Sequence, residues 1–158
     1  MDMNGRTVEN SIVETTHIIR PNHLNGSGRL FGGILMQWID EVAALSAMRH
    51  ARTNVTTVSV DNLNFMKSAR SRDVVVLRGH VTHVGNTSLE VQVDTYVEAM
   101  DGNRHMINRA FLTLVCLGEN DAPTKVAPLV LQTFEEKEAW KAGEKRREMR
   151  KTRKEEGF

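Results

Sequence analysis

Residues 22–48 read NHLNGSGRLFGGILMQWIDEVAALSAM, and this stretch decides the fold of the 158-residue chain. A polar, glycine-rich loop leads into a long apolar segment. The polar residues between positions 34 and 48 are Gln37, Asp40, Glu41 and Ser46. A helix that is apolar nearly all round is buried rather than laid on a surface. We therefore predict a buried helix over about residues 30–50, with the Asp40 carboxylate on an otherwise apolar face.

The sequence on either side of this helix is typical of β-strands. Before it, residues 7–19 are rich in β-branched residues and predict one strand, which Pro21 ends. After it, strands are predicted over residues 55–65, 73–84, 88–100 and 104–117. Residues 88–100 alternate cleanly between apolar and polar, and short turns predict hairpins between the last three strands.

This order of elements predicts an α+β fold, with one long buried helix against a five-stranded antiparallel sheet. One helix cannot cover both faces of such a sheet, yet residues 110–117 are apolar on both faces. Something must cover the other side or extend the sheet at its edge, which favours a homo-oligomer. We expect one domain over residues 1–130 and a charged helical tail over residues 131–158.

The C-terminal tail is highly charged. Residues 135–156 contain nine Lys/Arg and seven Asp/Glu, spaced so that i,i+3 ion pairs can form along a helix. Two interpretations stay open. The helix is simply solvated, or its basic residues bind an anionic partner; these residues are Lys145, Arg146, Arg147, Arg150 and Lys151.

Composition excludes several classes of protein. The net charge of +1 gives no overall argument for binding nucleic acid or a membrane surface, and no apolar run approaches the ~18 residues of a membrane span. The single cysteine, Cys116, excludes an internal disulfide and a cysteine zinc cluster, which fits a reducing cytoplasm. Residues 1–5 show no secretion signal pattern, so we expect a cytoplasmic protein.

Asp40 and the loop before its helix suggest a catalytic site. Gly32 and Gly33 allow another group to approach the backbone closely, and free N–H groups at a helix start bind negative charge. Gly33 and Asp40 are seven residues apart, close to two helical turns, so both lie near one stripe of the helix. An oxyanion site beside a carboxylate base suits hydrolysis of an activated acyl group. The alternatives are a structural Asp40 satisfied by nearby donors, and glycines that serve only packing.

The sequence from Asn25 through FGG (residues 31–33) to Asp40-Glu41 resembles the signature of the hotdog-fold acyl-CoA thioesterases, the broad-specificity acyl-CoA hydrolases. The resemblance continues in residues 58–67, 73–91 and 108–115 and covers about residues 8–118. It implies a long helix wrapped by a curved antiparallel sheet, and an acyl-CoA thioester as the substrate. It also implies dimers with paired edge strands, often assembled as trimers of dimers.

The resemblance also implies a catalytic pair, Asn25 and Asp40, that commonly comes from two different subunits. Asp40 would activate water or attack the thioester itself, the Gly33 N–H would stabilise the oxyanion, and the Asn25 amide would orient water or the carbonyl. This scheme needs no metal and no cofactor apart from the coenzyme A of the substrate.

Further residues are candidates for binding coenzyme A. Lys67, Arg70 and Arg72 follow the second predicted strand and could pair with its phosphates, although solvated loop charges explain them as well. The turn of Gly85, Asn86, Thr87 and Ser88 offers N–H and hydroxyl groups, and its alternative is a plain hairpin. Gly32 is the last candidate for contacting the substrate. The histidines are too scattered to predict a metal site.

Two other functions compete with hydrolysis. The first is a non-catalytic regulator of the same fold that binds acyl-CoA. Asp40 argues against it, because a protein that only binds acyl-CoA has no need of a base. A hotdog dehydratase would use a histidine with the helix acid, and no histidine neighbours position 40.

Overall fold

The computed structural model describes residues 4–158, apart from the side chain of Asn62. Residues 1–3, part of the stretch inspected for a secretion signal, lie outside the described residues. Helix α1 spans Gly32–Ala51, and helix α2 spans Phe134–Glu156. The main strands are β2 (Val13–Ile18), β3 (Asn54–Phe65), β4 (Val74–Val84), β5 (Ser88–Glu98) and β6 (Arg104–Leu117).

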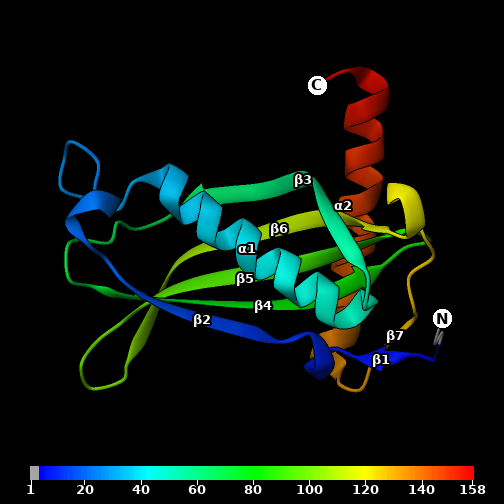
Figure 1. Cartoon of the computed structure of the whole chain (residues 1–158), viewed down its shortest axis with the longest axis horizontal. Helices are drawn as coiled ribbons and strands as arrows, with labels where there is room; N and C mark the ends of the chain where they lie inside the picture. Colours follow the sequence, from blue (N-terminus) through cyan, green and yellow to red (C-terminus); the bar gives the residue numbers. More distant parts are fainter. Residues whose placement is uncertain (1–3) are drawn as a thin grey trace.

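These strands form one antiparallel sheet in the order β2-β4-β5-β6-β3, with β2 and β3 at its edges. The sheet curves around α1, which lies across its concave face (Figure 1). Apolar side chains of α1 such as Leu35, Ile39 and Val42 are buried against the alternating apolar residues of β4, β5 and β6. The predicted α+β hotdog architecture is confirmed, with the long helix and four of the strands close to their expected bounds.

The prediction of one strand over residues 7–19 is wrong. The segment divides into β1 (Arg6–Thr7), a 3-10 turn (Glu9–Ser11) and β2, and β1 pairs instead with β7 (Leu129–Val130). The Ser11 hydroxyl donates to the Val8 carbonyl at 2.6 Å and accepts from the Val81 N–H at 2.9 Å. A local side-chain hydrogen bond therefore competes with the strand ladder and bends the chain.

Helix α2 is not a solvated tail. It packs against the face of the sheet opposite α1 (Figure 1), where Trp140 lies 4.1 Å from the ring of His83. Gly143 is buried, and a Cβ there would lie 2.8 Å from the Cβ of His83. A capping box between Thr133 and Glu136 starts the helix. Part of the second sheet face is therefore covered within the same chain.

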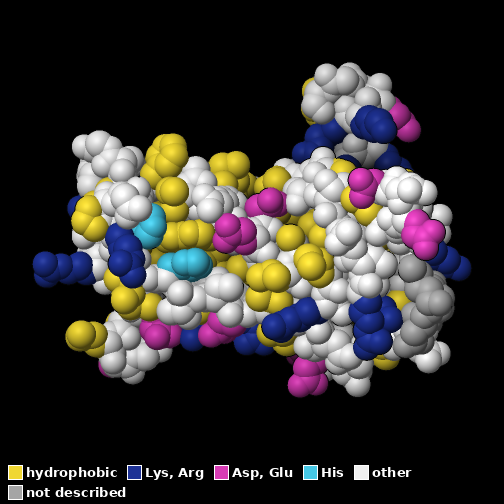
Figure 2. All heavy atoms as spheres, viewed as in Figure 1, with side chains coloured by type: hydrophobic (Ala, Val, Ile, Leu, Met, Phe, Trp, Pro, Cys, Tyr) yellow, Lys and Arg dark blue, Asp and Glu magenta, His cyan; other side chains and the backbone are white. Residues whose placement is uncertain are grey.

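The prediction that α1 is buried all round is only half right. In a single chain one face of the helix is open to solvent, and hydrophobic side chains gather over it (Figure 2). The exposed apolar residues of this helix and its N-cap are Phe31, Met36, Leu45 and Met48. On the adjacent edge strand β3, Val58, Val60 and Phe65 are also exposed. We call these exposed apolar residues of α1 and β3 the α1–β3 face, and their number on one helix and one edge strand is typical of an interface.

Within residues 4–158, no helix is both long and apolar enough to cross a membrane.

Candidate active site

Asp40 lies on the exposed face of α1 and is held in place by the neighbouring strand. The Thr57 hydroxyl of β3 donates to Asp40 Oδ1 at 2.6 Å. This bond uses one carboxylate oxygen, and none of the described residues donates a hydrogen bond to the other, Oδ2. The carboxylate is thus oriented, but it is exposed in the single chain rather than buried as the sequence suggested.

The start of α1 provides free backbone donors. Phe31 is the N-cap and its side chain caps nothing, while its carbonyl accepts from the N–H groups of Ile34 and Leu35. No acceptor among the described residues pairs with the N–H groups of Gly32 and Gly33. Such orphan donors at the positive end of a helix dipole bind a negatively charged oxygen.

Gly33 and Asp40 line the same groove, of about 310 Å³. Its other lining residues are mainly apolar and include Met36, Leu63 and Leu112. A carboxylate, an unpaired amide and an apolar wall therefore meet at one place, which suits an acyl group with a reacting carbonyl.

Asn25 uses its side-chain oxygen to shape the loop before α1. Asn25 Oδ1 accepts hydrogen bonds from the N–H groups of Ser27 at 2.9 Å and Arg29 at 3.2 Å. The Nδ2 group finds no acceptor within the part of the chain that the structure describes. The amide can therefore act only as a donor toward a ligand.

Asn25 and Asp40 do not line the same cavity in one chain. Asn25 lines a separate cleft of about 710 Å³, together with Gly32, Arg29, Lys67 and other residues. The catalytic pair suggested by the resemblance is therefore divided between two cavities of the same chain.

The cleft beside Asn25 has a basic rim. Lys67 lines it together with Arg29 and His105, and a role for Lys67 in binding phosphate stays a prediction. Arg70 is exposed and lies outside the lining residues, although its backbone pairs with that of Arg29.

The predicted turn of Gly85, Asn86, Thr87 and Ser88 lies at the far end of the sheet from this cleft, at the hairpin between β4 and β5 (Figure 1). Its backbone is bonded to β6 and to the segment after it: the Cys116 N–H of β6 donates to the Thr87 carbonyl, and the Val126 N–H donates to the Asn86 carbonyl. A single chain does not bring this turn together with Asp40.

His17 and Cys116 are two further side chains of types that can carry chemistry. His17 stacks on Trp38 with 4.1 Å between ring centroids, and burial lowers the pKa of His17. Cys116 is a buried free thiol whose pKa is raised to about 11 by burial, so it is not a nucleophile. Across residues 4–158, no three His, Cys, Asp or Glu side chains converge as metal ligands would.

Comparison with known proteins places the chain in a family. Residues 27–101 match the profile of the thioesterase superfamily. YkhA of Bacillus subtilis, described as an uncharacterized acyl-CoA thioester hydrolase, is 40% identical over 129 residues, covering 81% of this chain and 74% of YkhA. The chain belongs to the thioesterase superfamily. A longer superfamily member, the cytosolic acyl coenzyme A thioester hydrolase of rat, is 34% identical, and the chain spans 38% of its length.

Solved structures of this superfamily share the fold. A hexameric acyl-CoA thioesterase is 38% identical, with a TM-score of 0.90 over 95% of this chain and 97% of that chain. The acyl-CoA hydrolase of Staphylococcus aureus, solved with butyryl coenzyme A and coenzyme A, is 29% identical, with a TM-score of 0.91 over 96% of this chain and 93% of that one.

The Staphylococcus aureus enzyme has also been solved with an asparagine, an aspartate or a threonine replaced by alanine. Those three positions follow one another at intervals of 15 and 17 residues, and the same intervals separate Asn25, Asp40 and Thr57 here.

Sequence reasoning missed Thr57, Arg29 and His105. Thr57 lies in a strand whose inward face is shifted by a register irregularity between Thr57 and Ser59, so alternation alone does not show that it points toward α1. Arg29 is adjacent to the FGG motif, and its basic charge was a usable signal. His105 comes from a distant strand, and only the fold places it beside Lys67.

Proposed function

We propose that this thioesterase-superfamily protein hydrolyses the thioester of acyl-CoA to a free acid and coenzyme A, with Asp40 and Asn25 as its catalytic pair. The observation that carries the proposal is the Asp40 carboxylate, fixed by Thr57, in one groove with the unpaired N–H of Gly33. The hydrolase names of the relatives and the bound coenzyme A species of the Staphylococcus aureus enzyme support the substrate class.

The reaction uses groups that are already oriented. Asp40 Oδ2 accepts a proton from water, and the resulting hydroxide attacks the thioester carbon. The negative charge that develops on the carbonyl oxygen is stabilised by the Gly33 N–H; one such donor contributes about 10²–10³-fold in rate. When the tetrahedral intermediate collapses, the C–S bond breaks, and the thiolate of coenzyme A leaves and takes up a proton. Direct attack by Asp40, through an acyl-enzyme anhydride that water then opens, is the alternative for the first step.

Asn25 acts through its Nδ2 group. Because Oδ1 is occupied by two backbone donors, Asn25 is a hydrogen-bond donor to the thioester carbonyl rather than an acceptor that orients water. It then shares the oxyanion with Gly33, and it holds the substrate against the groove.

The complete site requires a second copy of the chain. Asn25 and Asp40 line separate cavities, and β3 is an edge strand with an exposed apolar face. Antiparallel pairing of β3 with β3 of a second copy would continue the sheet and cover the α1–β3 face. That covering would exclude water from around Asp40. Such dimers assemble further as a trimer of dimers, in keeping with the hexameric relative.

Coenzyme A enters by its phosphates at the basic rim formed by Arg29, Lys67 and His105. Arg70 and Gly32 lie next to this rim and complete the binding surface. The turn at Gly85, Asn86, Thr87 and Ser88 can contact substrate only from another subunit.

The test is thiol release from a panel of acyl-CoA substrates. Asp40→Asn is expected to lower kcat by about 10³-fold, within the range for a positioned base, while it still binds coenzyme A. Glu41→Gln is the matched control, because Glu41 is the adjacent exposed acid and accepts a hydrogen bond from Gln37 at 3.1 Å. If the wild-type protein binds acyl-CoA and releases no thiol, the non-catalytic regulator replaces the hydrolase.

A further inference from the structure

The loop that presents Asn25 runs from β2 to α1, and its tip, which includes Asn25, is exposed. The two arms of this loop meet at a narrow base. There the Phe31 N–H donates to the His23 carbonyl at 2.8 Å, and Leu24 forms an isolated bridge with Leu30. Asn25 follows Leu24 directly, so the position of its side chain depends on how this base is held.

The two arms of the loop are anchored in different ways. The returning arm is tied to the connection between β3 and β4, because the Leu30 N–H donates to the Ala69 carbonyl at 2.8 Å. The hydrogen bonds of the outgoing arm, residues 20–24, all end on residues of the loop itself, as far as the structure describes the chain. Side-chain contacts must therefore hold the outgoing arm against the body of the protein.

The imidazole ring of His23 provides such a contact. Its Nδ1 atom accepts a hydrogen bond from the Arg20 N–H at 3.0 Å and closes the 3-10 turn that starts the loop. The same ring lies nearly perpendicular to the indole of Trp38, with 5.1 Å between centroids, an arrangement that aromatic rings favour. Trp38 is a buried residue of α1, two positions before Asp40. One ring therefore connects the loop of Asn25 to the helix of Asp40.

The bond from Arg20 depends on one atom of the ring. Because Nδ1 is the acceptor, the hydrogen of the neutral imidazole lies on Nε2. A phenylalanine at position 23 would keep a ring beside Trp38 and lose the acceptor. An asparagine would lose the ring and offer Oδ1, which lies the same number of bonds from the backbone as Nδ1. The two substitutions therefore separate the hydrogen bond from the ring contact.

We infer that His23 is a positioning residue for Asn25. Its Nδ1 atom fixes the outgoing arm, and this arm in turn holds the Asn25 Nδ2 group where the thioester carbonyl binds. The inference rests on the proposed function, in which Asn25 stabilises the oxyanion as a donor. A displaced donor loses much of its effect, because catalysis depends on groups that are placed before the reaction begins.

Thiol release by single variants is the first test. We expect His23→Phe to lower kcat about five-fold, the scale of one hydrogen bond, and His23→Asn to keep most of the rate because it restores the acceptor. His17→Phe is the matched control. His17 stacks on the same indole at 4.1 Å but belongs to β2, so this variant should release thiol as the wild type does. Equal rates for His23→Phe and His23→Asn would overturn the inference.

A double-mutant cycle separates positioning from a general loss of folded enzyme. If His23 acts through Asn25, His23→Phe causes no further loss in the Asn25→Ala background, where residual thiol release is read at high enzyme concentration. A further loss of about five-fold there, equal to that in the wild type, would mean that His23 acts independently of Asn25. If Asn25→Ala releases thiol as fast as the wild type, the catalytic pair itself is wrong, and this inference fails with it.

Hydrogen exchange gives a readout that needs no turnover. Amide exchange over residues 20–31, measured by mass spectrometry, reports how often the base of the loop opens. We expect faster exchange in this segment for His23→Phe and exchange close to that of the wild type for His23→Asn. Exchange in His23→Phe that is as slow as in the wild type would show that the Nδ1 bond does not hold the loop.

Discussion

At the scale of single residues, the site depends on which atoms are already occupied. The side-chain oxygen of Asn25 accepts hydrogen bonds from the loop backbone, and one carboxylate oxygen of Asp40 accepts a hydrogen bond from the Thr57 hydroxyl. Each side chain therefore presents one defined atom to a ligand, a donor in Asn25 and an acceptor in Asp40. Fixing these atoms before the substrate binds removes reorganisation from the reaction.

Thr57 is a positioning residue, and its hydroxyl is the part that matters. Thr57→Val keeps the shape and removes the donor to Asp40, so we expect kcat to fall about ten-fold or more, as for one lost hydrogen bond to a charged group. Thr57→Ser keeps the donor and should retain most of the rate. Thiol-release assays with both variants beside the wild-type protein check this. Equal losses in the two variants would assign Thr57 a packing role instead.

The candidate catalytic residues could be predicted from the sequence because they lie in one short stretch. Asn25, Gly33 and Asp40 lie within 16 positions, and the loop-to-helix transition fixes their mutual placement. That Asn25 and Asp40 of one chain line separate cavities agrees with the two subunits that the family resemblance implied, whereas residue spacing alone contains no information about a second copy. The role of Thr57 could not be predicted for another reason. The side of the sheet on which its side chain lies depends on an irregularity in the strand register.

Thr113 provides a prediction on stability. In the ligand-free protein its buried hydroxyl has no partner, so Thr113→Val removes an unsatisfied polar group without changing shape. We expect the free energy of unfolding to stay equal or to rise by about 1 kcal/mol. Ser59→Ala, a hydroxyl deletion on the facing strand, is the comparison. A loss above about 1 kcal/mol in urea unfolding of Thr113→Val would mean that the hydroxyl is already bonded.

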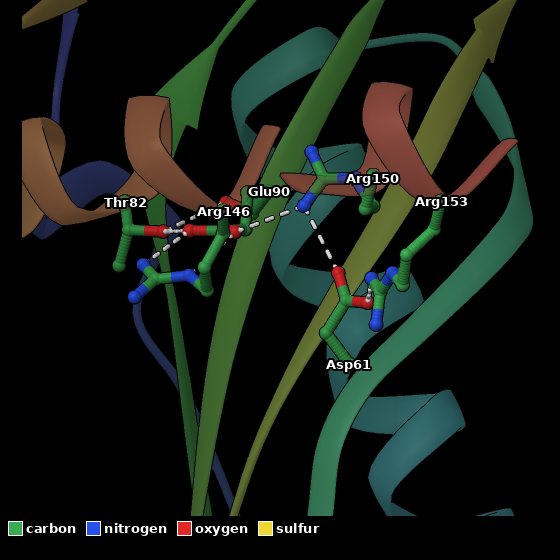
Figure 3. Close-up of polar contacts among 6 residues, drawn as sticks. All are labelled: Asp61, Thr82, Glu90, Arg146, Arg150 and Arg153. Carbon is green, nitrogen blue, oxygen red and sulfur yellow. Dashed lines mark hydrogen bonds and ion pairs between the residues drawn. The ribbon is translucent and has the colours of Figure 1, made fainter. Parts of the chain in front are cut away.

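At the scale of elements, α2 shows how a charged helix can belong to a core. Strand β5 was predicted correctly as alternating, but its polar face is not solvated: Glu90 is 2% exposed because Arg146 covers it (Figure 3). Charge counting alone cannot distinguish a solvated helix from one whose arginines have buried partners, since both have the same composition. The partners of Arg146 and Arg150 lie more than fifty residues away in sequence.

The docking of α2 can be tested at Gly143. In a free helix Gly→Ala is stabilising by about 1 kcal/mol, but a Cβ at position 143 would lie 2.8 Å from His83 Cβ and 3.1 Å from Glu90 Oε1. We therefore expect Gly143→Ala to lower the free energy of unfolding by about 1–3 kcal/mol. The exposed neighbour gives the control, because Ala142→Gly should cost only the helix propensity. Stabilisation by Gly143→Ala, read by urea unfolding, would show that α2 does not pack on the sheet.

At the scale of the whole molecule, burial of histidines sets the response to pH. The pKa values of His17, His50, His80 and His83 are all lowered, in each case chiefly by desolvation. Below about pH 6.5 these histidines bind protons in the unfolded chain but stay neutral in the folded chain. The free energy of unfolding is therefore highest above this pH and falls as the pH drops toward the lowered pKa values of the folded chain. Urea midpoints at pH 8, 7, 6 and 5 should decrease from pH 7 downward. A midpoint that stays level to pH 5 would contradict this assignment.

The order of elements predicted the α+β hotdog architecture, and the assembly of the subunits is the question that remains to be tested. If the proposed site takes Asn25 from one subunit and Asp40 from its partner, two inactive variants can rescue each other. In a dimer of Asn25→Ala with Asp40→Asn, one site carries both substitutions and the other carries neither. Random mixing makes about half of the dimers mixed, so activity should return to about a quarter of the wild-type level.

A site contained within one subunit predicts a different result for the same experiment. Every chain in the mixture then carries one damaged residue of its own site, and remixing cannot restore a complete pair. The two variants are unfolded together, refolded and assayed for thiol release, with each variant refolded alone as the control. Activity near a quarter of the wild-type level would require a site shared between two subunits. Activity no higher than that of the separately refolded variants would exclude such a site. The contrast works because Asn25 and Asp40 line separate cavities of the single chain, about 710 and 310 Å³ in volume.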